Sequence, residues 1–169
     1  MPSLILTALS VMIIAFALVA GTSYINPAMQ SRVEVSKVLT AQYGSIGSAI
    51  ASYRVVNQGV RPSSMKDVEG YVAAGAITGF GRRSELFTWT IEPGPSGKPG
   101  LCLSFGGGAV DYGILSGFER FAIDADTQRP GALSFGQNCS APAIALAPSE
   151  LAHHLNEMRT ALAIRFEER

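Results

Sequence analysis

The first part of the chain is apolar and uncharged. No Asp, Glu, Lys, Arg or His occurs from Met1 to Ser31, and Arg32 is the first charged residue. A helix rises about 1.5 Å per residue, so roughly 20 apolar residues cross the hydrocarbon core of a bilayer. The nearly uninterrupted apolar pattern of residues 4–25 therefore predicts one membrane-embedded helix.

A cleaved secretory signal and a buried core helix are the alternatives for this segment. A signal peptide would need a basic region before the apolar run, which is absent, and residues 18–20 form only a passable cleavage site. A helix of this length in a small soluble domain would carry charge on some face. We therefore expect a retained membrane helix. Its predicted membrane and assembly surface consists of Leu4, Ile5, Leu6, Leu9, Val11, Ile13, Ile14, Phe16, Leu18 and Val19.

The pattern becomes amphipathic after Pro27. Apolar residues recur at three- and four-residue steps between Val35 and Tyr53, which predicts one long helix with a single apolar stripe over residues 28–56. Small residues fill much of the stretch 44–49. They permit another element to approach the helix backbone closely. That element is the domain's own sheet, a neighbouring subunit, or both on different faces of the helix.

The middle of the chain combines a short helix, strands and glycine-rich turns. Ser64 followed by Asp67 predicts a capped short helix that ends near Gly70. Residues 111–123 favour another short helix. The predicted strands are 86–91, 100–105 and 132–135, with a Pro- and Gly-rich turn at 93–97. The expected fold class is α+β, with a long N-terminal helix packed on a small antiparallel sheet.

The last part of the chain predicts an extended linker followed by an amphipathic helix. Residues 141–148 form the linker, and Ser149 is expected to cap a helix that runs to the C-terminus. Its apolar seam consists of Leu151, Leu155, Met158, Leu162 and Phe166. Docking of this seam on the chain's own domain is favoured over a coiled coil, which needs more turns. The predicted divisions are 1–27 (membrane helix), 28–57 (amphipathic helix), 58–140 (globular domain) and 141–169 (linker and C-terminal helix).

Charge and candidate chemistry argue against several functional classes. Lys+Arg and Asp+Glu are both 13, so the formal net charge is zero and no long-range field attracts nucleic acid. His153 and His154 are adjacent, about 100° apart on a helix, and cannot chelate one ion as an i,i+4 pair would. The Gly106–Gly108 run lacks the ending of a phosphate-binding loop. Alternating oxygen side chains at 124–128 lack the glycine of a calcium loop. We expect no enzyme, cofactor or metal site.

The architecture resembles a type IV pilin, or a pilin-like subunit of a type II secretion or conjugative system. The resemblance rests on the apolar segment 4–20 followed by the amphipathic segment 33–53. It also rests on the run Gly59 to Val68, which contains Pro62-Ser63-Ser64, and on the late cysteine pair. It implies a structural subunit that waits in the inner membrane and then joins an extracellular filament, as in pili used for cell adhesion, conjugation or secretion. The implied partners are other pilin subunits and the pilus assembly platform.

Two features depart from the family pattern. Pilins are made with a short basic leader that a peptidase removes, and no leader precedes the apolar segment here. If Met1 is the mature first residue, the family implies a methylated α-amino group on it. The family's fifth mature residue is Glu, whereas Ile5 stands here, and no carboxylate precedes Glu34. Family members that lack this Glu are typically minor pilins, including the conjugative-pilus PilV type. The departure therefore favours a minor subunit, or one whose packing in the filament is purely apolar.

Cys102 and Cys139 are the whole cysteine complement. They stand where the resemblance implies the C-terminal disulfide loop of a pilin. An even cysteine count in an exported chain also favours a disulfide, with two free buried thiols as the alternative.

The expected function is therefore that of a pilin or minor pilin. The main alternative is a membrane-anchored periplasmic binding or accessory module that does not polymerise. A membrane-tethered hydrolase is the least favoured function. Both histidines fall in the predicted terminal helix, so the sequence offers no Ser or Cys nucleophile with a partner histidine as its base.

Overall fold

The computed structural model describes residues 27–72, 86–93, 97, 99–106, 110–158 and 161–166. The predicted membrane and assembly residues, from Leu4 to Val19, and the predicted methylation site Met1 lie outside these ranges. Among the described residues, no helix is both long and apolar enough to cross a membrane.

A long helix, α2 (Pro27–Val56), begins directly after the apolar segment and runs for 30 residues. It agrees with the amphipathic helix predicted over residues 28–56. Leu39 and Ile46 on its inner face are fully buried. The helix ends at Val56, and the next residue, Asn57, closes it: its backbone N–H and side-chain amide both donate to the carbonyl oxygen of Tyr53, each at 2.9 Å. Gln58 and Gly59 then adopt positive φ values, which turn the chain out of the helix.

The short helix α3 (Met65–Glu69) follows, with Ser64 as its N-cap and Gly70 as its C-cap, as predicted. Oδ2 of Asp67 accepts hydrogen bonds from the backbone N–H groups of Ser63 (2.8 Å) and Ser64 (2.9 Å) and from the hydroxyl of Ser63 (2.9 Å). These bonds satisfy donors that the first helical turn leaves free. They stabilise the ionised carboxylate, so the pKa of Asp67 is lowered from its ordinary value.

Four strands form one antiparallel sheet in the order β1-β2-β4-β3. The strands are β1 (Phe87–Pro93), β2 (Pro99–Phe105), β3 (Leu133–Gly136) and β4 (Leu162–Phe166). The first three agree with the predicted strands to within two residues at each end. The α+β class, the long helix and the small antiparallel sheet are therefore confirmed.

The prediction of a helix running from Ser149 to the C-terminus was wrong. A 3₁₀ turn, η2 (Pro148–Glu150), starts one residue before Ser149, and α5 (Leu151–Met158) is only eight residues long. The chain then enters β4, which pairs with both β2 and β3 at the centre of the sheet. Leu162 and Phe166 therefore belong to a strand, not to a helical seam.

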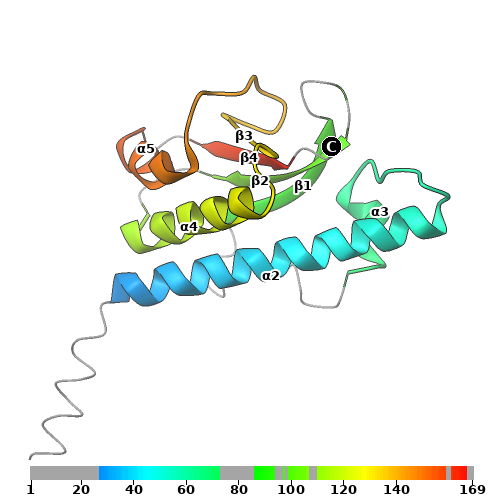
Figure 1. Cartoon of the computed structure of the whole chain (residues 1–169), viewed down its shortest axis with the longest axis horizontal. Helices are drawn as coiled ribbons and strands as arrows, with labels where there is room; N and C mark the ends of the chain where they lie inside the picture. The colour runs from blue at the N-terminus through cyan, green and yellow to red at the C-terminus, as the bar shows by residue number, and fades with distance from the viewer. Residues whose placement is uncertain are drawn as a thin grey trace, which may run out of the picture.

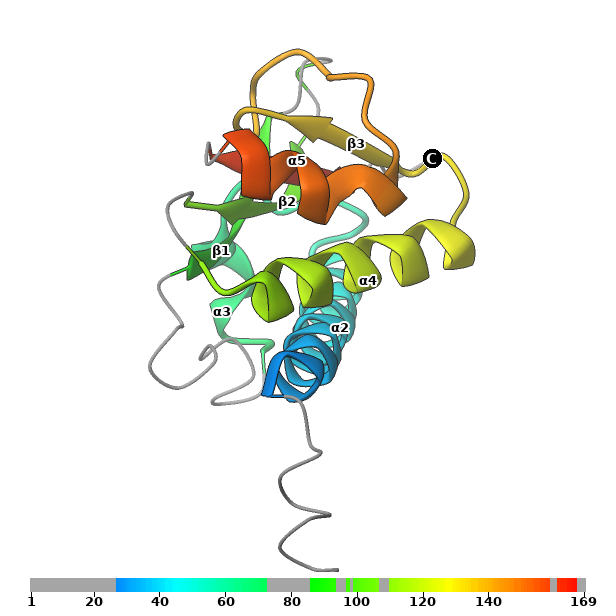
Figure 2. The same ribbon diagram turned by 90° about the vertical axis from the view of Figure 1, so that its left-hand side faces the viewer.

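Helix α4 (Tyr112–Gln128) is longer than the predicted helix over 111–123. Asp111 caps it, since its Oδ1 accepts the N–H of Gly113 at 2.8 Å. Figures 1 and 2 show α4 crossing α2, with α5 packed beyond it. The aromatic core joins the two long helices to one face of the sheet. Its rings are Tyr43, Phe87, Trp89, Phe105, Phe118, Phe121 and Phe166.

Two glycines of α4 allow this helix crossing. A Cβ at Gly113 would lie 2.6 Å from the carbonyl oxygen of Ala28, and a Cβ at Gly117 would lie 2.7 Å from that of Arg32. The two backbones therefore approach more closely than any larger residue permits. The small residues Gly44 and Gly47 on α2 behave differently, because a Cβ at either would meet nothing within 4 Å. They are not used for packing against the described residues.

Candidate functional site

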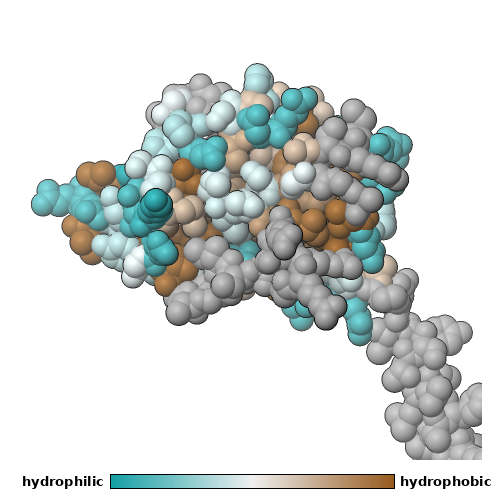
Figure 3. All heavy atoms as spheres, turned by 180° about the vertical axis from the view of Figure 1, so that it is seen from behind, coloured by the Kyte–Doolittle hydropathy of each residue, from teal (hydrophilic) through white to brown (hydrophobic). Residues whose placement is uncertain are grey.

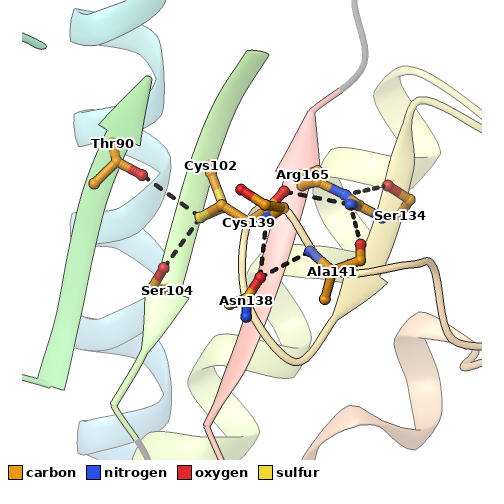
Figure 4. The surroundings of a disulfide bond; sticks show 9 residues. Thr90, Cys102, Ser104, Ser134, Asn138, Cys139, Ala141 and Arg165 are labelled. Atoms are coloured by element: carbon orange, nitrogen blue, oxygen red, sulfur yellow. Dashed lines mark hydrogen bonds between the residues drawn. A yellow bond between two sulfur atoms is a disulfide. The ribbon is translucent and has the colours of Figure 1, made fainter. Parts of the chain in front are cut away.

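The disulfide between Cys102 and Cys139 links the middle of the sheet to the loop after β3, which confirms the predicted pairing. Both cysteines are buried. The hydroxyl oxygens of Thr90 and Ser104 lie 3.5 and 3.3 Å from the sulfur of Cys139, on the face of the sheet opposite the helices (Figure 4). A disulfide sulfur has no proton, so the two hydroxyls are the donors.

Arg165 is the second anchor of the same loop. It lies on β4 opposite Cys102 on one side and Ser134 on the other, and only 5% of it is exposed. Its Nε donates to the hydroxyl of Ser134 at 3.1 Å, while Nη1 donates to the carbonyl oxygens of Cys139, at 3.3 Å, and Ala141. Figure 4 shows these bonds converging from one guanidinium. The loop is thus held covalently at Cys139 and by hydrogen bonds from Arg165 to the carbonyl oxygens of Cys139 and Ala141.

Asn138 shapes this loop from within. Its Oδ1 accepts the N–H groups of Ser140 (3.0 Å) and Ala141 (2.7 Å). Further on, the N–H of Ile144 donates to the carbonyl of Phe135 at 2.8 Å. The segment predicted as a linker is therefore fastened to the edge of the sheet, and its apolar side chains Ile144 and Leu146 pack against the core.

Three of the polar residues that were considered as site residues, His153, Asp124 and Asp126, have partners within the fold. His153 lies 3.3 Å from a carboxylate oxygen of Glu157, and both side chains are mostly exposed. Asp124 lies near Arg120, and Asp126 accepts the N–H of Gly131 at 3.1 Å. Within the described ranges, no three His, Cys, Asp or Glu residues come together in a way that could hold a metal ion.

The outer side of α2 carries exposed apolar residues. Met29 and Val33, four residues apart, are 57% and 37% exposed, and Val55 near the other end is 82% exposed. Seen from behind, hydrophobic residues form separate patches between polar areas (Figure 3). Tyr112 on α4 is also exposed, and the neighbouring Gly113 touches Ala28. An apolar surface therefore lies close to the point where α2 begins.

A cavity of about 500 Å³ lies beside the second half of α2. It is lined by residues of α2, the following loop, the ends of β1 and β2, the segment after α4, and Phe166 of β4. Its residues come from six separate segments, so the local sequence pattern does not predict it. The sequence signal for the cavity was the glycine pair Gly44 and Gly47. Their small size indicates space beside the helix, but it does not show which other segments border that space.

The close helix crossing was also missed from sequence. Its signal was the spacing of Gly113 and Gly117, two small residues separated by one helical turn in an apolar context.

Comparison of the chain with models of known families, with curated proteins and with solved structures found no significant match.

Proposed function

We propose that the chain is a structural subunit, a pilin or minor pilin, of a type IV pilus or related filament. In this proposal the apolar segment 4–20 holds the subunit in the inner membrane. The same segment later packs against neighbouring subunits in the filament. The partners are other pilin subunits and the assembly platform, and no enzymatic activity is part of the role.

One observation carries the proposal: α2 starts directly after the apolar segment 4–25 and extends 30 residues along the domain. Most of the domain lies on one side of this helix (Figures 1 and 2). The first turns of α2 present exposed Met29 and Val33. In the proposal, the apolar segment 4–20 is suited both to lipid and to packing against copies of itself, while α2 carries the domain along one side.

The lack of a carboxylate before Glu34 makes a minor subunit the preferred form of the proposal. A chain with Ile5 offers shape and apolar contact to its neighbours, but no charge that could pair with an N-terminal amine. A major subunit with Glu at the equivalent position would then supply that pair, which sets the register of packing even where its net stabilisation is small.

The test is to express the full chain with a pilus assembly machine but without any other pilin, and to image sheared material. A minor subunit gives no filaments until a Glu-bearing pilin is added, and then the chain is found in them. Abundant filaments of this chain alone would make it a major subunit. Retention in the membrane in a host with intact pili would favour the anchored periplasmic module.

A further inference from the structure

Exposed apolar side chains gather at the end of the domain where α2 begins. Met29 and Val33 are four residues apart, so they share one face of α2, and both are exposed. Tyr112, the first residue of α4, is also exposed. Figures 1 and 2 show that α2 and α4 start at the same end of the domain. Single exposed apolar residues are common on protein surfaces, but these three come from two elements and lie at one end.

The glycine crossing fixes Tyr112 at this end. A Cβ at Gly113, the next residue, would lie 2.6 Å from the carbonyl oxygen of Ala28, so the backbone beside Tyr112 touches the first turn of α2. One turn further on, Gly117 makes a similarly close contact with the carbonyl oxygen of Arg32. Two such contacts leave α4 no room to slide or rotate against α2. The three exposed side chains therefore belong to one rigid surface.

The sequence before α2 indicates what this surface meets. The apolar segment 4–25, which is predicted to lie in a membrane, ends two residues before Pro27, and Arg32 is the first charged residue. At about 1.5 Å per residue, Met29 and Val33 lie about 3 and 9 Å along the helix axis from Pro27. Elements that rest on a bilayer bury their apolar face about 5–10 Å into the headgroup boundary. Both side chains thus lie close to the predicted membrane surface.

Tyr112 is a residue type that this boundary favours. Tyr and Trp are enriched at membrane–water interfaces, because the ring sits among apolar groups while its polar tip reaches water. The neighbouring charge, Asp111, is held by the fold: its Oδ1 accepts the N–H of Gly113 at the N-terminus of α4, where the helix dipole favours a negative charge. A carboxylate engaged in this way is compatible with a position beside lipid headgroups.

We propose that Met29, Val33 and Tyr112 form a juxtamembrane patch that rests in the headgroup region of the bilayer before the subunit is assembled. The partner is a lipid surface. The contact holds the domain in one orientation, with the starts of α2 and α4 against the membrane. This inference rests on the membrane segment of the proposed function, but it does not depend on polymerisation.

The opposite end of α2 provides a comparison within the same chain. Val55 and Val56 are more exposed than Met29, and Tyr71 is exposed beside Tyr53, with ring centroids 5.9 Å apart. Tyr53 lies about 36 Å further along the helix than Met29. Apolar exposure alone would place both ends in contact with lipid. The position of the membrane segment selects only the end at Met29.

Quenching by brominated lipid distinguishes the two ends, because bromine quenches tryptophan emission only at short range. The full chain is placed at one copy per nanodisc, in phosphatidylcholine with or without bromine on the acyl chains. Trp89 is the only tryptophan and is buried, so the parent chain gives the baseline. Tyr112→Trp and Tyr71→Trp each add one exposed indole. We expect brominated lipid to reduce the added emission of Tyr112→Trp, which is also blue-shifted, and to leave that of Tyr71→Trp unchanged.

A second set of variants tests whether the patch acts as a unit. In the Tyr112→Trp background, Met29→Ser combined with Val33→Ser removes apolar contact and is expected to reduce the quenching. The matched control, Val55→Ser combined with Val56→Ser, is expected to leave it unchanged. All four positions are exposed, so the fold is retained, which far-UV circular dichroism checks.

Failure of this inference can be told from failure of the proposed function. In discs that contain the chain, equal quenching at positions 112 and 71, or none at either, rejects the patch and leaves the filament proposal intact. A blue shift of Tyr112→Trp that appears only in discs with two copies, without quenching, assigns the patch to a second copy and also rejects the lipid contact. A chain that does not enter the discs at all contradicts the membrane segment, and with it both proposals.

Discussion

Gly117 of α4 lies against Val35 of α2 so closely that a Cβ at Gly117 would be 2.7 Å from the Cβ of Val35. The carbonyl oxygen of Arg32 would lie equally close to it. Val35 is buried in the core, and rotation of its side chain does not move its Cβ. The distance between the two helices is therefore set by the absence of a side chain at Gly117.

The first prediction is that the same substitution has opposite effects on the two helices. Gly117→Ala must push α4 away from α2 and is expected to lower the free energy of unfolding by about 1–3 kcal/mol, the range of overpacked cores. Gly44→Ala on α2 meets no atom and should raise it by about 0.5–1 kcal/mol. Urea unfolding of both variants, followed by Trp89 fluorescence, measures the difference. Equal effects would show that the crossing is not as tight as described.

The second prediction concerns solubility. A chain shortened to begin at Ala28 is expected to fold and to remain soluble without detergent, because α2 and every later helix bury an apolar face on the domain. Size-exclusion chromatography and far-UV circular dichroism check this. Aggregation of the shortened chain, with the full chain soluble in plain buffer, would mean that residues 1–27 belong to a soluble core.

The third prediction concerns the disulfide. Cys102 and Cys139 are separated by 37 residues, and closing a loop of that size stabilises a fold by about 4 kcal/mol in the chain-entropy model. Reduction should therefore lower the urea midpoint strongly. Mass analysis of the exported protein should show two hydrogens fewer than the reduced chain. Alkylation of both thiols without prior reduction would contradict this.

The fourth prediction concerns Arg165. Arg165→Met keeps much of the apolar stem but leaves the carbonyls of Cys139 and Ala141 without their donor, so we expect a loss of about 2–3 kcal/mol. Arg120→Gln, an exposed change on α4, is the control and should alter stability by less than about 0.5 kcal/mol. Hydrogen exchange at Ile144, whose N–H bonds to Phe135, should also become faster in the Met variant. Unchanged exchange would mean that the disulfide alone holds the loop.

The fifth prediction follows from the lowered pKa of Asp67. A carboxylate with a lower pKa in the folded state than in the unfolded state adds stability above its unfolded pKa. That contribution is lost as the pH falls through the folded pKa, so the affected window is below about pH 4. Unfolding midpoints between pH 2 and 7 should depend less on pH in Asp67→Asn than in the parent chain. Parallel curves for the two proteins would exclude a contribution from Asp67.

The parts of the fold that follow from local pattern were predictable. The stripe of α2, the capped turn at Ser64 and Asp67, and the hairpin of β1 and β2 each rest on neighbouring residues. The Cys102–Cys139 pair was inferred from cysteine count and from resemblance. The long membrane-embedded segment stays a prediction, because the described residues begin at Pro27.

The strand β4 was not predictable in the same way. Leu162 and Phe166 are four residues apart, and a spacing of four places two residues on one face in a helix and in a strand alike. Ala163 and Arg165 are buried as well, so β4 lacks the polar alternation that marks a half-exposed strand. The burial of Arg165 depends on the disulfide loop above it, which is a tertiary contact.

The cavity beside α2 was not predictable for a related reason. Arg61 and Arg129 are 68 positions apart in the sequence, and only the folded chain brings them to the same cavity. Sequence pattern reports which residues share a helix or a strand. It does not report which segments meet at an open space.

The central position of β4 in the sheet has a consequence for biogenesis. β2 and β3 do not pair with each other, and both pair with a strand that follows every other described element in the chain. During synthesis or passage through a membrane pore, the sheet stays open until residues 162–166 emerge. Such long-range pairing slows folding. In the proposed exported subunit, the sheet is therefore completed only after β4 has been released on the far side of the membrane.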